Sequence, residues 1–175
     1  MTFFNADKIL LERVCLGNAE AIDFLANHWA PYCHEVDDII DRDRTGSEEI
    51  LSTFARAIIL YSHPFYLRNI AALRAVALAT TNTYADSVSW ERSAQPHQRE
   101  WADFNRHVGM DMVIAVAQVC GGYDHGRSVS QELRETCFAE HPHKATTYDE
   151  TAIPLHHRQM GSYPTPESPT RRNGD

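Results

Sequence analysis

The 175-residue sequence predicts an all-α protein, a single-domain bundle of about five to six helices, on three observations. Apolar residues recur at helical spacing almost everywhere up to about residue 140, which is the periodicity of amphipathic helices. The sequence does not contain runs of alternating β-branched residues bounded by hairpin turns. With 43% hydrophobic residues, a chain of this length can bury one core of ordinary size.

Start and stop signals divide this bundle into elements. Residue types that cap helix N-termini occur at Asn5, Asn18 and Ser47. Prolines, which break helices or occupy their first turn, occur at Pro31, Pro64 and Pro96. The predicted helices therefore cover residues 6–16, 19–43 with a kink near Pro31, 47–62, 65–92, 97–120 and 128–140.

The composition changes at about His141, where His, Thr and Pro replace the apolar residues. Residues 163–175 contain three prolines and cannot supply a core. We expect two regions: a helical bundle domain over residues 1–140, and a polar Pro/His-rich tail over residues 141–175 that is disordered.

Charge and composition narrow the classes of partner. A net charge of −8 argues against nucleic acid as a partner, because such binding needs clustered Lys and Arg. The apolar runs are shorter than the ~18 residues of a membrane span, and the first residues do not resemble a signal peptide. We expect no membrane partner and a cytoplasmic protein. Its thiols are expected to be reduced, because zinc-ligand spacing is not found around Cys15, Cys33, Cys120 and Cys137.

An acidic cluster on the second predicted helix is the first candidate site. Asp37, Asp38 and Asp41 gather on the face opposite the apolar stripe of that helix. Like charges at this spacing destabilise a helix by roughly 0.2–0.5 kcal/mol per pair. Coordination of Mg²⁺, or of Mn²⁺, by the carboxylates would offset the repulsion. The alternative is an ordinary amphipathic helix whose acidic face is solvated.

The run Asp37-Asp38-Ile39-Ile40-Asp41 resembles the Asp-rich motif of class I isoprenoid and terpene synthases. The resemblance implies an all-α enzyme in which these aspartates hold Mg²⁺ against a substrate diphosphate. The second metal motif of that family has Asn, Ser or Thr, and Glu at four-residue steps. Asn82 is similar at the first position, whereas Asp86 replaces the hydroxyl residue and Glu91 is displaced by one residue.

The helix predicted over residues 65–92 is apolar nearly all round, which is typical of a central helix. Asp86 shares a face with apolar residues, so we expect it to face the interior and to be paired, protonated or metal-bound. Asn82 and Asp86 could instead be satisfied by helix caps, by backbone groups or by arginines. The candidate metal ligands are Asp37, Asp38, Asp41 and Asp86.

Other residues complete the hypothesis of an enzyme. Glu35, or a water on the metal oriented by His34, would supply the attacking hydroxide, as the partial match of Glu35-x-x-Asp38 to compact all-α nucleotide pyrophosphohydrolases implies. The candidate substrate-binding residues are Asn82, Arg42 and Arg68. The two arginines could bind phosphate oxygens bidentately. His107 lies in a row of carboxylates, where it could act as a general base or a metal ligand; the alternative is a solvated edge.

Two functions from different classes follow. The first is a Mg²⁺-dependent enzyme that acts on a phosphorylated small-molecule substrate, either an isoprenoid diphosphate or a nucleoside triphosphate. The second is a non-catalytic helical protein for interaction or assembly, with a solvated acidic face. A homodimer is compatible with both functions.

Overall fold

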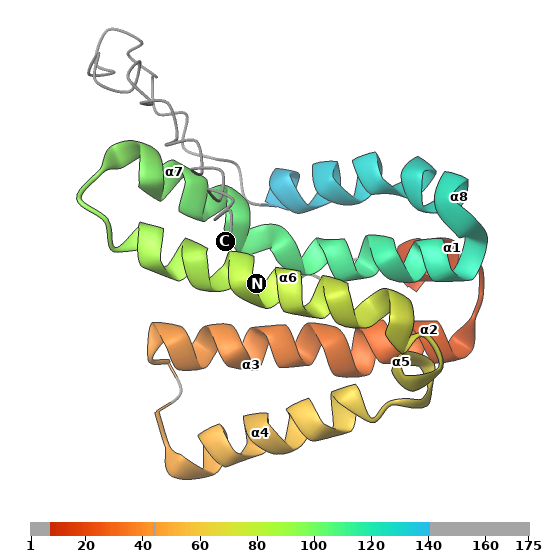
Figure 1. Ribbon diagram of the computed structural model, residues 1–175, viewed down its shortest axis with the longest axis horizontal. Coiled ribbons are helices and arrows are strands. Elements are labelled where there is room, and N and C mark those ends of the chain that lie inside the picture. Colours follow the sequence, from red (N-terminus) through yellow and green to blue (C-terminus); the bar gives the residue numbers. More distant parts are fainter. Residues whose placement is uncertain (1–7, 44, 141–175) are drawn as a thin grey trace, which may run out of the picture. The chain divides into compact units, whose positions relative to one another are not determined.

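The fold is taken from a computed structural model that describes residues 8–43 and 45–140 of the chain. Within these residues every regular element is a helix, which confirms the predicted all-α class (Figure 1). The predicted tail, residues 141–175, and the candidate cap Asn5 lie outside the described residues.

The first half of the described chain contains α1 (Lys8–Val14), α2 (Ala19–Asp23), the π-helix η1 (Phe24–Trp29), α3 (Ala30–Asp41) and α4 (Ser47–Tyr61). The second half contains α5 (Pro64–Arg68), α6 (Ile70–Glu91), α7 (Pro96–Asn105), the 3₁₀-helix η2 (Arg106–Gly109) and α8 (Met110–Glu140). The predicted cap Asn18 accepts hydrogen bonds from the backbone N–H groups of Glu20 and Ala21, both at 3.1 Å.

The irregularity predicted near Pro31 is the π-helix η1, which joins α2 to α3. Proline has no backbone N–H, and its ring crowds the carbonyl four residues earlier. The preceding turn is widened, so that the Ala30 N–H donates to the Leu25 carbonyl, five residues back. Such π-turns are frequent at functional sites.

Three predicted boundaries shift in the structure. The predicted helix 65–92 is divided at Asn69, whose side-chain amide donates to the Phe65 carbonyl at 2.8 Å and competes with the regular helix bonds. The predicted helix 97–120 is interrupted by η2, which ends at Gly109, a poor helix former. Gly122 has φ +81° inside α8 and kinks it, so the two predicted helices on either side of that point follow each other directly.

The core gathers side chains from most of these helices. α6 contacts α5, α7, η2 and α8, while α3 contacts η1 and α4. The largest buried side chains include Phe24, Leu25, Leu60, Leu73 and Met112. α6 buries one stripe and leaves Leu78 exposed, so the expectation of a helix covered on every side is wrong. The neighbouring helices cover only the side of α6 that faces the core.

Candidate functional site

A pocket of about 140 Å³ lies among α3, α6, η2 and the start of α8. Its wall is mostly apolar and includes Trp29, Cys33, Val36, Met110 and Val113. Burial raises the pKa of the Cys33 thiol to about 12, so this group is a neutral thiol near pH 7. The pocket is an apolar space with few charged groups on its lining.

The pocket is built on a contact between η1 and η2. Trp29, placed by the π-helix, donates from its indole Nε1 to the Gly109 carbonyl at 3.1 Å. Trp29 is buried, and Gly109 keeps the backbone of η2 close to Cys33. This bond holds two segments 80 residues apart and fixes one wall of the pocket.

A polar network closes one edge of the pocket. The Tyr84 hydroxyl, on α6, donates to Asp37 Oδ1 on α3. Burial and this bond to Asp37 raise the pKa of Tyr84, so its hydroxyl stays protonated as a donor. Arg106 Nη2 lies 3.1 Å from Asp41 Oδ1 and 3.7 Å from Asp37 Oδ1, and its Nη1 lies 3.1 Å from Glu91 Oε1. One guanidinium therefore neutralises part of the charge of three carboxylates.

Of the acidic cluster, only Asp37 lines the pocket. Asp38 is half-buried and Asp41 is exposed. The positive charge beside Asp37 and Asp41 is that of Arg106, a residue that the sequence pattern does not single out. A protein cation thus provides the charge compensation that the predicted metal ion would supply.

Asp86 and Asn82 are exposed, so the expectation that Asp86 faces the interior is wrong. Positions two residues apart on a helix point about 200° apart. Because Tyr84 faces Asp37, the side chains at 82 and 86 point to the other side of α6. The buried stripe of α6 carries Leu73, Ala77, Thr80 and Ser87 instead.

The predicted catalytic pair is divided between two sides of α3. His34 is half-buried and lines the pocket, and burial lowers its pKa, against the opposing effect of Asp37. Glu35 is buried toward α4, where it accepts a hydrogen bond from Thr53 Oγ1 at 3.2 Å and lies 2.8 Å from Arg56 Nε. Glu35 therefore ties α3 to α4 and is not directed at the pocket.

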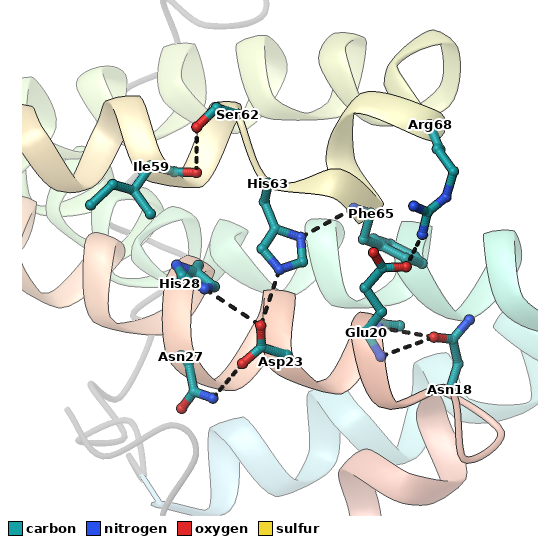
Figure 2. Close-up of polar contacts among 11 residues, drawn as sticks. Asn18, Glu20, Asp23, Asn27, His28, Ile59, Ser62, His63, Phe65 and Arg68 are labelled. Carbon is teal, nitrogen blue, oxygen red and sulfur yellow. Dashed lines mark hydrogen bonds and ion pairs between the residues drawn. The ribbon is translucent and has the colours of Figure 1, made fainter.

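The two predicted phosphate-binding arginines do not converge on the acidic cluster. Arg42 is an exposed residue in the left-handed C-cap of α3, at φ 67°. Arg68, at the end of α5, pairs with Glu20 of α2 (Figure 2). The prediction that Arg68 lies beside Asp37 and Asp41 is wrong, because its partner belongs to the opposite end of the α2–η1–α3 segment (Figure 1).

Two polar groups on the pocket wall are buried without a hydrogen-bond partner in the described part of the chain. They are Thr80 Oγ1 and Arg106 Nε. Thr80 is 7% exposed. An unsatisfied buried polar group costs about 1–3 kcal/mol, so such groups in a pocket are typical of a site that supplies them with an external partner.

A second cluster joins η1 to the start of α5 (Figure 2). Asp23 Oδ2 lies 3.1 Å from His63 Nε2 and 3.6 Å from His28 Nε2. Within residues 8–43 and 45–140 this is the grouping of three side chains that is close enough to hold a metal ion. Hydrogen bonds from Asn27 and His63 lower the pKa of Asp23, so it is ionised at neutral pH.

The second ring nitrogen of His63 limits what this cluster can do. His63 Nδ1 accepts a hydrogen bond from the Phe65 N–H at 3.2 Å and so caps the N-terminus of α5 (Figure 2). A neutral imidazole has one N–H, so its proton lies on Nε2, facing Asp23. A metal ion at Nε2 would move the proton to Nδ1 and remove the cap. The cluster as it stands is an Asp–His hydrogen bond that holds α5 against α2.

Most of the residues that build the pocket lack a signal in the sequence. Tyr84 lies 47 residues from its partner Asp37, and Arg106 lies 65 residues from Asp41. His107 is the exception, since the pattern of carboxylates singles it out. It is buried at 6% exposure and lines the pocket, so the interpretation as a solvated edge is wrong for His107.

Comparison of the chain with protein-family models, with curated protein sequences and with solved structures finds no match. Among the described residues, no helix combines the length and the apolar character needed to cross a membrane. The fold and the site therefore define an all-α protein with a small apolar pocket edged by a charged network.

Proposed function

We propose that the chain binds a compact, mainly apolar and uncharged small molecule with one or two hydrogen-bond acceptor groups, in the pocket among α3, α6 and η2. The observation that carries the proposal is a pair of buried donors on the mostly apolar wall, Thr80 Oγ1 and Arg106 Nε, that lack a partner within the described residues. An acceptor atom of a ligand would pair with either donor.

The volume of the pocket limits the size of the ligand. A dry apolar cavity of about 150 Å³ holds one benzene molecule, and this pocket measures about 140 Å³. A single ring or a short branched chain fits this space. For such a ligand we expect a Kd in the micromolar to millimolar range, weaker than the limit of roughly 20 nM that about 1.5 kcal/mol per heavy atom sets for seven heavy atoms.

The charges at the edge favour a neutral ligand. Asp37, Asp41 and Glu91 surround the single guanidinium of Arg106, so this edge carries more negative than positive charge. A phosphate or carboxylate would be repelled there unless a cation accompanied it. A ketone, an aldehyde, an ether or an alcohol avoids this repulsion and still offers an acceptor.

The test uses two ligands of matched shape, cyclohexanone and methylcyclohexane, and measures their binding by calorimetry and thermal shift. We expect the ketone to bind more tightly than the hydrocarbon. Thr80→Val should weaken binding of the ketone three- to tenfold and leave binding of the hydrocarbon unchanged. Thr81→Val is the control, because the hydroxyl of Thr81 already donates to the Ala77 carbonyl. If neither ligand binds at millimolar concentration, or if both variants weaken binding of the ketone equally, the proposal is wrong.

A Mg²⁺-dependent enzyme acting on an isoprenoid diphosphate or a nucleoside triphosphate is a second proposal. Its support is the position of Asp37 on the pocket wall, with Asp41 bound to the same guanidinium. It predicts that millimolar Mg²⁺ raises the melting temperature and that pyrophosphate is released from one of these substrates. Asp37→Asn would abolish both effects, whereas Asp86→Asn, at an exposed position, would leave them intact.

A further inference from the structure

α4 turns its apolar side away from the protein. Leu51 and Phe54 are each 65% exposed, Ile58 is 71% exposed and Ile59 is 53% exposed. The first three lie at i, i+3 and i+7 and therefore form one stripe along the helix. We call these four residues, with Ala55 between them, the α4 stripe.

The opposite side of α4, which faces the protein, is unusually polar. Thr53 is buried there beside Glu35, and Arg56 pairs with the same carboxylate. Leu60 is the large apolar side chain that α4 buries completely. Helices at the surface of a monomer normally bury their apolar stripe, so the pattern of α4 is typical of a helix whose stripe is covered by a second surface.

The area of the α4 stripe suits a small interface. Four large apolar side chains that are each more than half exposed present a patch on the order of a few hundred Å². Patches of this size on monomers are often functional. Two copies face to face, with the residues that flank the stripe, would bury about 1,000 Å² in total, the lower limit for a specific interface.

We propose that α4 is the interface of a homodimer, in which two copies of this helix pack antiparallel about a two-fold axis. The order of side chains is self-complementary about the point between Phe54 and Ala55. In an antiparallel pair this register sets Leu51 opposite Ile58 of the second copy, and Phe54 opposite Ala55 of the second copy. A large side chain thus meets a small one, as close packing of two helices requires.

The charges of α4 are consistent with a second copy of the chain as the surface that covers the α4 stripe. Antiparallel helices place the positive end of each dipole beside the negative end of the other. Glu48 and Glu49 lie in the first turn of α4, and the chain carries a net charge of −8, so an anionic lipid surface would be repelled. A copy of the same helix is therefore favoured over a membrane.

The test measures the mass of the full chain by sedimentation equilibrium between 1 and 100 μM. We expect a dimer with a Kd in the micromolar range, because the interface is near the lower limit of size. Leu51→Glu and Ile58→Glu should each weaken the dimer at least tenfold without changing the helical signal, because both positions are exposed in the monomer. Leu78→Glu, at a 60% exposed position on α6, is the matched control and should leave the dimer unchanged.

The orientation has its own test. The double variant Leu51→Lys/Ile58→Glu should dimerise more tightly than Ile58→Glu, because the antiparallel register places each lysine opposite a glutamate of the other copy. A monomer at 100 μM overturns the proposal, as does a dimer that persists in Leu51→Glu. Flotation of the monomeric chain with phosphatidylcholine vesicles, lost in Leu51→Glu, would identify a lipid surface as the occupant and would also overturn it.

Discussion

Replacement of Arg106 by methionine tests the charge balance at the edge of the pocket. The substitution keeps much of the apolar stem but removes the guanidinium from Asp37, Asp41 and Glu91. Hydrogen bonds to charged groups contribute about 1.5–3 kcal/mol each when buried. The Arg106 side chain is 22% exposed and its partners are 29–45% exposed, so solvent screening reduces the effect. We expect a net fall of about 2 kcal/mol in the free energy of unfolding, since removal of the unpartnered Nε offsets part of the loss.

The assay is urea unfolding at low and at high salt. Arg134→Met is the matched control: Arg134 pairs with Asp111 at 2.6 Å, but both side chains are more than 40% exposed. It should cost at most about 1 kcal/mol. The deficit of Arg106→Met should shrink at 1 M salt, where the Debye length is about 3 Å and the three carboxylates repel one another less. A loss no larger than that of Arg134→Met would refute the reasoning.

Three further predictions concern single contacts. Thr80→Val should raise the free energy of unfolding by about 1–2 kcal/mol in urea, because it removes a buried hydroxyl without a partner; a decrease would contradict the assignment. Glu35→Ala should lower it by about 2–3 kcal/mol, since Thr53 and Arg56 lose their shared partner, whereas exposed Glu48→Ala should change it little. The lowered pKa of Asp23 means that the stability it contributes is complete above its ordinary value, about 3.9, and is lost as pH falls through the lower folded value. The melting curves of the wild type and Asp23→Asn should therefore converge below pH 4, and a gap that stays constant from pH 7 to pH 3 would argue against it.

Local features of the fold follow from the sequence because they depend on neighbours along the chain. Asn18 caps α2 as expected, since a side chain two or three residues from a free N–H reaches it without help from the rest of the protein. Pro31 produces the predicted irregularity because its ring and its missing N–H act on the turn directly before it. Asn69 and Gly122 alter the predicted boundaries through non-helical backbone angles at single residues, which periodicity does not reveal.

The candidate site follows from the sequence only in part. Asp37 and His34 line the pocket, but Asp86, Asn82 and Arg68 do not join them. The prediction that Asp86 faces the interior is wrong because residues 65–92 are apolar on several faces, so hydropathy does not decide which face turns inward. A rotation of α6 by half a turn exchanges Tyr84 for Asp86 at the contact with α3.

Sequence periodicity by itself determined the all-α class and the acidic face of α3, because helix formation and amphipathicity depend on residues within one or two turns. Tertiary structure decided what that face meets. Tyr84 and Arg106 come from segments 47 and 65 residues further along the chain, and their donors meet Asp37 and Asp41 only when α6 and η2 pack on α3. The same packing leaves Thr80 Oγ1 and Arg106 Nε on the pocket wall, and a pairing between distant segments leaves no mark in local periodicity.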